Sequence, residues 1–192
     1  MPDRTAEQLP KGRHGLSREE VESSQRLRIL LGMAEAMRDQ GFVDTTVADV
    51  ITRAGVSRES FYRLFASKGA CFAAAFDQAA EILLQRLAAA ERAITAYLEA
   101  LAAEPAWARL FIVEVHAAGP EALRRRFALQ DRFVDALAAL LGLDSPDDRF
   151  TAQVVVAAMS AMVTRPLLDD DLDALRALGP PMVDHLRRVL QA

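Results

Sequence analysis

The sequence predicts an all-α protein. Alanine and leucine dominate the second half of the 192-residue chain, clusters of β-branched residues are few, and apolar residues recur at helical spacing along most of its length. With 52% hydrophobic residues, nine glycines and eight prolines, the chain can bury a sizeable core. We expect three parts: an N-terminal arm with the start of the first helix (1–24), a small three-helix unit with a linking fourth helix (25–84), and a larger helical unit (85–192).

Charge is spread unevenly along the chain. The formal net charge is −4, which for the chain as a whole argues against a nucleic-acid partner. The first 70 residues, however, hold eleven Lys or Arg against ten Asp or Glu. The segment from 53 to 68 holds four basic residues (Arg53, Arg58, Arg63 and Lys68) and one acidic residue, Glu59. We therefore expect attraction to phosphate to be confined to this segment.

The absence of certain residues and motifs argues against several classes of protein. Cys71 is the single cysteine, so an intramolecular disulfide is excluded, and no Cys/His group has metal-ligand spacing. No apolar run approaches a membrane span, and the N-terminus lacks the hydrophobic region of a signal peptide. The three histidines lie far apart, and no glycine-rich phosphate loop or GxSxG motif is present. We expect a cytoplasmic protein that is not an enzyme and binds neither metal nor cofactor.

The first helix is predicted from 17 to about 40. Residues 1–16, rich in proline, glycine and basic residues, cannot bury much apolar surface and are expected to form a mobile tail. Ser17-Arg18-Glu19-Glu20 fits a capping box, and Gly41 is placed to end the helix. The expected buried stripe is formed by Leu27, Leu30, Leu31, Ala34 and Met37.

Two short helices joined by a glycine are predicted between 45 and 68. Val47, Val50, Ile51 and Ala54 form one apolar face, preceded by Thr46 as an N-cap and followed by Gly55, which tolerates positive φ. Ser57 can cap the second helix, whose apolar face holds Phe61, Leu64 and Phe65. This helix, tight turn and helix suit a helix-turn-helix, in which the second helix enters the major groove of DNA.

These residues carry a resemblance to a family. The segments Thr45–Val47, Ala54–Ser57 and Phe61–Lys68, with Gly41-Phe42 upstream, resemble the DNA-binding domain of TetR-type transcriptional repressors. The resemblance implies a homodimer that binds a palindromic operator, and a C-terminal domain that binds a small effector and dimerises. It also implies that a ligand shifts the spacing of the two DNA-binding heads through the fourth helix.

The candidate DNA-binding residues lie on the second short helix and at its borders. Arg58 and Arg63 can bind guanine edges or phosphates, and Glu59 can accept from cytosine. The resemblance assigns a phosphate contact to Tyr62. We expect Lys68, beside free N–H groups at a helix start, to anchor a phosphate. The full predicted set is Thr45, Thr46, Ser57, Arg58, Glu59, Ser60, Tyr62, Arg63 and Lys68.

Two further groups of basic residues have alternative interpretations. Residues 1–16 are either a basic arm that touches DNA or a leader without function. Arg26 and Arg28 are either contacts to the DNA backbone or solvated surface charges.

Six more helical patterns follow Ser67. This residue is expected to cap the first of them, a fourth helix running to about Ala90. The family usually has an acidic residue where this chain has Gly69, so a capping box is absent there. Further patterns run over about 91–104, 105–116, 121–141, 150–163 and 182–190. The segment near 85–105 is short for the family, which suggests a reduced pocket floor. Asp169, Asp170 and Asp171 suit a solvated, N-capping loop better than a metal site.

The larger unit offers two candidate surfaces. The pattern from 150 to 163 is apolar nearly all round, so it needs cover on every side, either from a second copy or as a central core helix. For a two-fold interface we expect Val154, Val155, Ala158, Met162, Met182, Leu186 and Val189. An apolar effector pocket with a few polar groups is expected among Trp107, Leu110, Phe111, Glu114, His116, Phe133, Leu137 and Met159.

Two functions from different classes remain. The first is a sequence-specific DNA-binding transcriptional regulator, a repressor released by a small apolar ligand. The second is a helical ligand- or partner-binding protein whose helix-turn-helix no longer reads DNA. Steep loss of DNA affinity with added salt distinguishes the first from the second.

Overall fold

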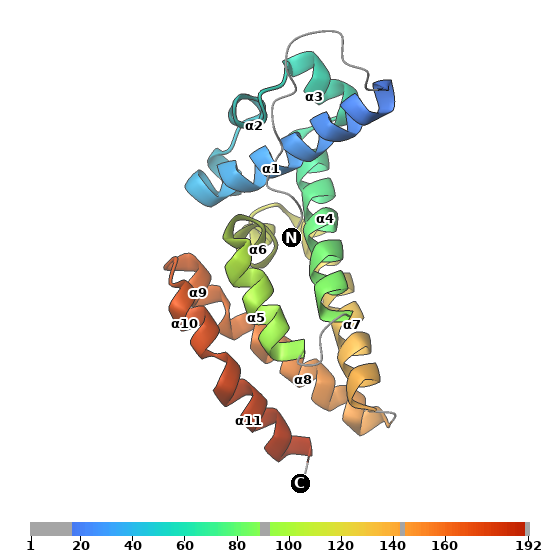
Figure 1. Cartoon of the computed structure of the whole chain (residues 1–192), viewed down its shortest axis with the longest axis vertical. Coiled ribbons are helices and arrows are strands. Elements are labelled where there is room, and N and C mark those ends of the chain that lie inside the picture. The colour runs from blue at the N-terminus through green and yellow to red at the C-terminus, as the bar shows by residue number, and fades with distance from the viewer. Residues whose placement is uncertain (1–16, 89–92, 143–144, 191–192) are drawn as a thin grey trace. The chain divides into compact units, whose positions relative to one another are not determined.

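The computed structural model describes residues 17–88, 93–142 and 145–190, and every regular element in these ranges is helical (Figure 1). Contacts divide the chain into two compact units, Met1–Ala75 and Phe76–Ala192, here unit 1 and unit 2. The division falls within one helix, Lys68–Ala88. The domain limits expected from the sequence, after residues 24 and 84, remain a prediction.

The helices are α1 (Arg18–Asp44), α2 (Val47–Ala54), α3 (Arg58–Leu64), α4 (Lys68–Ala88), α5 (Ala93–Ala103), α6 (Pro105–Ile112), the 3₁₀ helix η1 (Glu114–His116), α7 (Pro120–Leu141), α8 (Pro146–Met162), α9 (Thr164–Leu168), α10 (Leu172–Ala177) and α11 (Gly179–Leu190).

The start and end of α1 follow the sequence signals. The Ser17 hydroxyl accepts from the Glu20 backbone N–H at 3.1 Å, and the Glu20 carboxylate accepts from the Ser17 N–H at 2.7 Å, so the predicted capping box forms. Gly41 adopts φ 76°, which breaks the regular helix where the sequence indicated, and a short extra turn continues to Asp44.

The buried face of α1 is wider than the predicted stripe, of which Leu30, Ala34 and Met37 are buried as predicted. Leu27 is 50% exposed and Leu31 is half-buried, whereas Ile29, Met33 and Ala36 are buried. The reason is that α1 packs against both α2 and α3, so it buries a wider arc than a single stripe. The predicted stripe was therefore wrong at Leu27.

Close packing between α1 and α2 depends on Gly32. A Cβ atom at this position would lie 2.9 Å from the Val50 carbonyl oxygen and 3.1 Å from the Ala54 nitrogen. Both atoms belong to the backbone of α2, so they cannot rotate away. Glycine therefore lets the two helices approach, and Arg28 closes the same contact by donating to the Ala54 carbonyl at 3.0 Å.

The helix-turn-helix forms between 46 and 65 as the spacing predicted. Thr46 and Asp49 make a capping box at the start of α2, and Gly55 ends the helix with φ 61° in the left-handed region. Ser57 caps α3, and Phe61 and Phe65 on its inner face are 0% and 4% exposed. Ser67 starts α4 by accepting from the Ala70 N–H at 3.1 Å, and Cys71 and Phe72 in its first turns are buried in unit 1.

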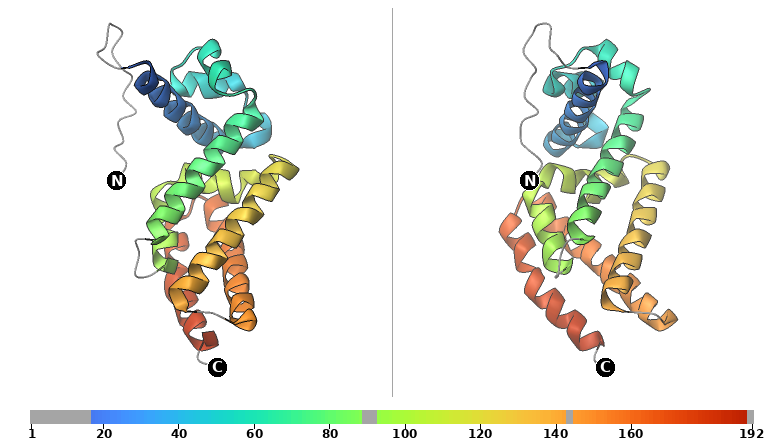
Figure 2. Two further views of the ribbon diagram at one scale, coloured as in Figure 1. Left: turned by 90° about the vertical axis from the view of Figure 1, so that its right-hand side faces the viewer. Right: turned by 45° about the vertical axis from the view of Figure 1, so that its right-hand side comes forward.

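Unit 2 is built around α7 and its neighbours. Its core includes the ring pairs Phe76–Phe111 and Tyr97–Phe133, whose centroids lie 6.2 and 6.1 Å apart. In both views of Figure 2, α7 and α8 lie side by side, and they contact each other. Gly142, with φ 65°, ends α7.

The segment between α8 and α11 contains two short helices that the sequence analysis missed, α9 and α10. The Asp171 side chain accepts from the Ala174 N–H at 2.8 Å, which confirms the expected N-capping role in the acidic triplet. One stretch, Pro146–Leu168, is long and apolar enough to cross a membrane by length and composition, contrary to expectation, with 33% of it buried. Core helices of globular proteins meet the same criterion, and this stretch consists of two helices, since α8 ends and α9 begins at Val163.

Candidate DNA-binding and effector sites

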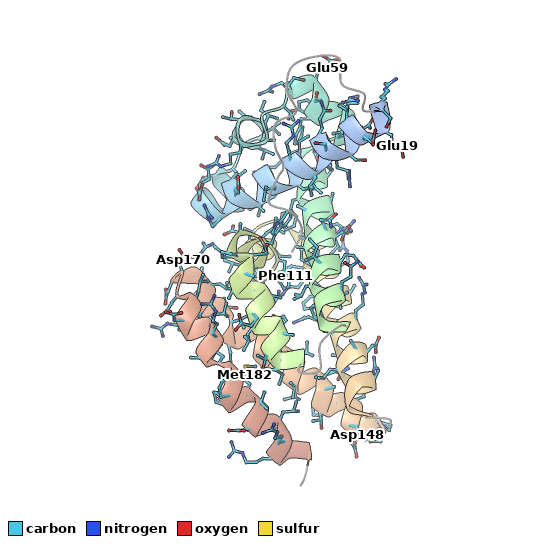
Figure 3. The ribbon with its side chains drawn as sticks, in the orientation of Figure 1. Glu19, Glu59, Phe111, Asp148, Asp170 and Met182 are labelled. Carbon is cyan, nitrogen blue, oxygen red and sulfur yellow. The ribbon has the colours of Figure 1, made fainter. Side chains whose placement is uncertain are left out.

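The outward face of α3 carries three exposed side chains, those of Arg58, Glu59 and Tyr62. Glu59 lies on the side of α3 remote from α1 (Figure 3). Arg58 and Glu59 make no hydrogen bond or ion pair with any residue in the described ranges. Tyr62 is 48% exposed, and its ring rests edge-on against Phe61 at 5.4 Å between centroids. The inner face of α3 is therefore fixed in the core while these outer side chains remain available to a ligand.

Serine and threonine hydroxyls at the helix starts already make hydrogen bonds within the first turns of α2 and α3. The Ser57 hydroxyl accepts from the Ser60 N–H and donates to the Ser60 hydroxyl, both at 3.0 Å. The Thr46 hydroxyl donates to the Asp49 carboxylate at 2.6 Å. Hydrogen bonds from Thr46 hold the pKa of Asp49 below its ordinary value. These groups hold the first turns of α2 and α3 in place at the surface.

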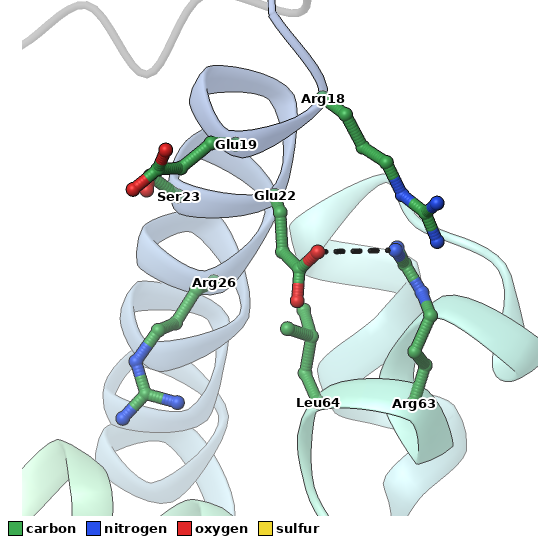
Figure 4. Close-up of a pocket in the computed structure, with 7 residues that line it drawn as sticks. All are labelled: Arg18, Glu19, Glu22, Ser23, Arg26, Arg63 and Leu64. Carbon is green, nitrogen blue, oxygen red and sulfur yellow. Dashed lines mark hydrogen bonds and ion pairs between the residues drawn. The ribbon is translucent and has the colours of Figure 1, made fainter.

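Arg63 points back toward α1 (Figure 4). Its guanidinium lies 3.5 Å from the Glu22 carboxylate and donates to the Gln25 side chain at 2.7 Å. Arg18, which the sequence analysis did not select, reaches toward Arg63 from the first turn of α1. Together they line a groove of about 660 Å³ formed by Arg18, Glu19, Glu22, Ser23, Arg26, Arg63 and Leu64. Only the fold reveals Arg18, because its distance in sequence from α3 gives no signal.

Three other arginines contact neighbours within unit 1, namely Arg53, Arg26 and Arg28. Arg53 donates to the Asp39 carboxylate at 3.0 Å, and this bond, together with Arg38, holds the pKa of Asp39 below its ordinary value. The Arg26 guanidinium lies 4.9 Å above the Phe65 ring, and Arg28 binds carbonyls at the end of α2. Arg26 remains exposed, as expected for a surface charge, whereas Arg28 is half-buried and bound to these carbonyls, so the interpretation as solvated surface charge was wrong for Arg28.

Lys68 is engaged by the backbone. Its ammonium group donates to the carbonyls of Phe42 and Thr45 at 2.8 Å and to that of Val43 at 3.3 Å. The Lys68 ammonium group thus binds the carbonyls at the end of α1, whereas the sequence led us to expect a free ammonium group that anchors a phosphate. Thr45 is 1% exposed, and its hydroxyl donates to the Gly41 carbonyl at 2.7 Å, so this side chain is not presented to a ligand.

Most of the expected effector residues lie in the interior of unit 2. Leu110, Phe111, Glu114, Phe133, Leu137 and Met159 are buried, and Trp107 is half-buried. Glu114 lies 4.0 Å from Arg109, whose guanidinium also donates to the Leu167 carbonyl at 2.6 Å. His116 differs from the expectation: η1 turns Glu114 and Val115 inward and leaves the imidazole exposed.

The expected dimer residues line an apolar groove between α8 and α11. Val154 and Met162 are 51% and 45% exposed, and Ala158 is also exposed. Val155 and Met182 are half-buried and Leu186 is buried; the side chain of Val189 lies outside the described part. The groove has a volume of about 360 Å³ and includes Phe150, which is 65% exposed and was not selected from the sequence.

Residues 29–75, which include α2 and α3, match the family model described as "Bacterial regulatory proteins, tetR family". The match shows that this segment, with its helix-turn-helix, is of the TetR type. The family that this model describes is regulatory rather than enzymatic, and the match supports a DNA-binding regulator. Among curated proteins, none matches the chain significantly.

Several solved structures share the fold of this chain. The fatty acid degradation regulator FadR from Bacillus halodurans is 17% identical, with 84% of this chain and 94% of that chain covered and a TM-score of 0.70. FadR from Bacillus subtilis, solved with stearoyl-CoA, is 17% identical, with coverage of 83% and 96% and a TM-score of 0.69. A TetR-like regulator from Rhodococcus sp. RHA1 is 19% identical, with coverage of 92% and 99% and a TM-score of 0.68. At these identities the likeness establishes the fold.

Proposed function

We propose that the chain is a cytoplasmic, homodimeric repressor that binds a palindromic operator and is released by a small apolar ligand. The observation that carries the proposal is the two-sided character of α3. Its inner face is buried through Phe61, while Arg58, Glu59 and Tyr62 face outward next to the capped start of the helix. A helix held in this way can enter a major groove with its N-terminal residues against base edges.

Within this interface, Arg58 is the base-reading residue. Its guanidinium is uncommitted in the described part of the chain, and a fork of N–H donors matches the O6 and N7 acceptors of guanine. Tyr62, Thr46, Ser57 and Ser60 border the same face and supply hydroxyl contacts to phosphate or bases. Glu59 accepts from cytosine.

Arg18 and Arg63 extend the interface toward the groove beside α1. Arg63 makes its phosphate contact by exchanging Glu22 for a DNA oxygen. For Lys68 and Thr45 we propose supporting roles, because their polar atoms already satisfy the backbone at the end of α1.

The second copy covers the groove between α8 and α11. Val154 and Met162 are half exposed on a helix whose opposite side packs on α7, so this apolar face has no cover in the described chain. A two-fold axis brings α8 and α11 of two copies together as a four-helix interface. Dimerisation also places two α3 helices about one turn of DNA, roughly 34–36 Å, apart.

The effector binds in unit 2 among the buried aromatic residues. Leu110, Phe111, Phe133, Leu137 and Met159 supply apolar surface, with Glu114 as a polar neighbour. FadR from Bacillus subtilis, which shares the fold, was solved with stearoyl-CoA. Release requires that the effector prefer the arrangement that does not bind DNA, because a ligand with equal affinity for both shifts nothing.

Selection of bound duplexes from a random DNA pool tests the proposal. The expected result is an inverted repeat whose half-sites are one helical turn apart, bound with an affinity that falls steeply as salt rises. Failure to retain any duplex at low salt would contradict DNA binding and favour a helical ligand- or partner-binding protein. A single half-site without symmetry would contradict the dimer, and sedimentation of the free protein would check that result independently.

A further inference from the structure

Arg126 is a buried cation on α7 with little compensation. It is 7% exposed, and its guanidinium donates one hydrogen bond, to the Phe111 carbonyl at 2.9 Å. Within the described ranges, no carboxylate pairs with it. A guanidinium has five N–H donors and does not lose its proton in proteins, so the Phe111 carbonyl leaves most of its donors without a partner in the described part of the chain, at nitrogens that are not completely buried.

Other arginines in the same unit, in contrast to Arg126, have carboxylate partners. Arg109 lies beside Glu114 and donates to two carbonyls of α9, and Arg125 pairs with Asp77 at 2.9 Å and with Glu121 at 3.7 Å. These carboxylates compensate the two charges, although the Nε of each arginine is buried without a hydrogen-bond partner. Arg126 is more deeply buried than Arg125 yet has a single carbonyl. The unit therefore maintains a positive charge in its interior that its own described carboxylates do not neutralise.

The surroundings of Arg126 combine hydroxyl groups with apolar rings. Tyr97 on α5 is buried beside it: burial raises the pKa of the phenol, while Arg126 and the Ser160 hydroxyl act in the opposite direction. Gln130, one turn along α7, donates to the Ser160 hydroxyl at 3.2 Å. The Phe133 ring packs edge-on against Tyr97. Burial also lowers the pKa of Arg126, which reflects the cost of its isolated charge.

We infer that Arg126 receives the oxyanion of the effector, a carboxylate or phosphate carried on an apolar body. This inference rests on the proposed ligand-released function and specifies the chemistry of that ligand. The oxyanion neutralises the guanidinium and accepts its unused donors, and Tyr97 contributes a further hydroxyl donor. The apolar body packs among the neighbouring aromatic side chains, including Phe133 and Phe111. The charge of Arg126 thus determines which polar group of the ligand binds, and the apolar side chains bind the rest of the ligand.

A matched ligand series tests this inference on the full chain. Butyrate, octanoate, dodecanoate, hexadecanoate and dodecyl phosphate are compared with dodecanol and dodecyltrimethylammonium, by calorimetry of binding and, separately, by release of operator DNA. The expected result is binding by at least one oxyanion, about tenfold or more tighter than the neutral and cationic probes. The carboxylates and the phosphate distinguish the two oxyanions. Arg126→Gln should lower that affinity by about tenfold or more, whereas Arg126→Lys should retain part of it.

Arg124→Gln is the control, since Arg124 lies on the same helix but pairs at the surface with Glu121. This variant should bind as the wild type does. Equal or tighter binding of dodecanol, failure of every oxyanion to bind, or unchanged oxyanion affinity in Arg126→Gln would overturn the inference. Because operator binding and operator release are measured separately, a neutral ligand that releases DNA would leave the proposed function intact while removing the role of Arg126. If Arg126→Gln does not fold, Arg126→Lys and the probe series still decide the question.

Discussion

The ammonium nitrogen of Lys68 lies 4.4 Å from the centre of the Phe42 ring and donates to the Phe42 carbonyl at 2.8 Å. The first residue of α4 therefore holds the end of α1 through both a cation–π contact and hydrogen bonds. Lys68→Met keeps the aliphatic stem but removes the charge and three donors. We expect unit 1 to lose about 2 kcal/mol of stability, as measured by urea unfolding. A normal unfolding midpoint together with a flatter salt dependence of DNA binding would contradict this structural role.

Arg58→Ala should weaken operator binding without changing the stability of the protein, in contrast to Lys68→Met. Because Arg58 makes no contact with the described chain, thermal unfolding should change little. Operator binding should weaken by about 1–3 kcal/mol, with relaxed preference at one base position. Binding to variant operators, one base pair changed at a time, measures this effect. Equal weakening on all sequences would reassign Arg58 to phosphate contact.

Glu22→Gln should strengthen DNA binding. Removing the carboxylate releases Arg63 from its ion pair of 3.5 Å and leaves the neutral Gln25 side chain as the remaining partner that phosphate must displace. Because the pair is exposed, we expect a gain of at most about fivefold at low salt, measured by titration with operator DNA. Glu19→Gln is the control, since it lines the same groove and changes the net charge equally. An equal gain in both variants would show a general charge effect instead.

Gly32→Ala and Gly69→Ala should have opposite effects on stability. A Cβ at Gly32 meets backbone atoms of α2 at 2.9 and 3.1 Å, so α1 and α2 must separate, at a cost of about 1–3 kcal/mol. At Gly69 the nearest atom is the Ser67 hydroxyl at 3.8 Å, so alanine fits and should stabilise α4 by about 0.5–1 kcal/mol. Melting temperatures of the two variants measure the contrast. A destabilised Gly69→Ala would contradict the open space at that position.

Acid should weaken the start of α2 through Asp49. Hydrogen bonds from Thr46 depress the pKa of this carboxyl in the folded state below its ordinary 3.8. A depressed folded pKa contributes stability that is present above the unfolded value and is lost as the pH falls through the folded value. Melting temperatures of wild type and Asp49→Asn should therefore differ at neutral pH and converge as the pH falls through the depressed folded-state pKa. A difference that persists in acid would show that the charge of Asp49 is not responsible.

Local signals in the sequence predicted the helix-turn-helix well. Ser17, Thr46 and Ser57 act within three residues of their partners, and Gly41 and Gly55 need positive φ whatever surrounds them. Such short-range requirements are visible in a single sequence.

Long-range contacts were not predictable in the same way. Lys68 and Phe42 are 26 residues apart, and Arg63 and Glu22 are 41 apart, so only the fold shows that these charges are already engaged. His116 was selected by residue type, yet the 3₁₀ turn directs it outward. Arg126 was missed because a single arginine in a helical pattern looks like surface charge.

The reactivity of the buried Cys71 thiol reports the opening of unit 1. Cys71 is the single cysteine of the sequence and is 0% exposed, and burial raises its pKa to about 12 while Arg26 acts in the opposite direction. The thiolate that reacts with alkylating reagents is therefore scarce while the unit stays closed. Alkylation then proceeds at the rate at which unit 1 opens, without any introduced label. Mass spectrometry of the alkylated chain, with and without operator DNA, would time that opening directly.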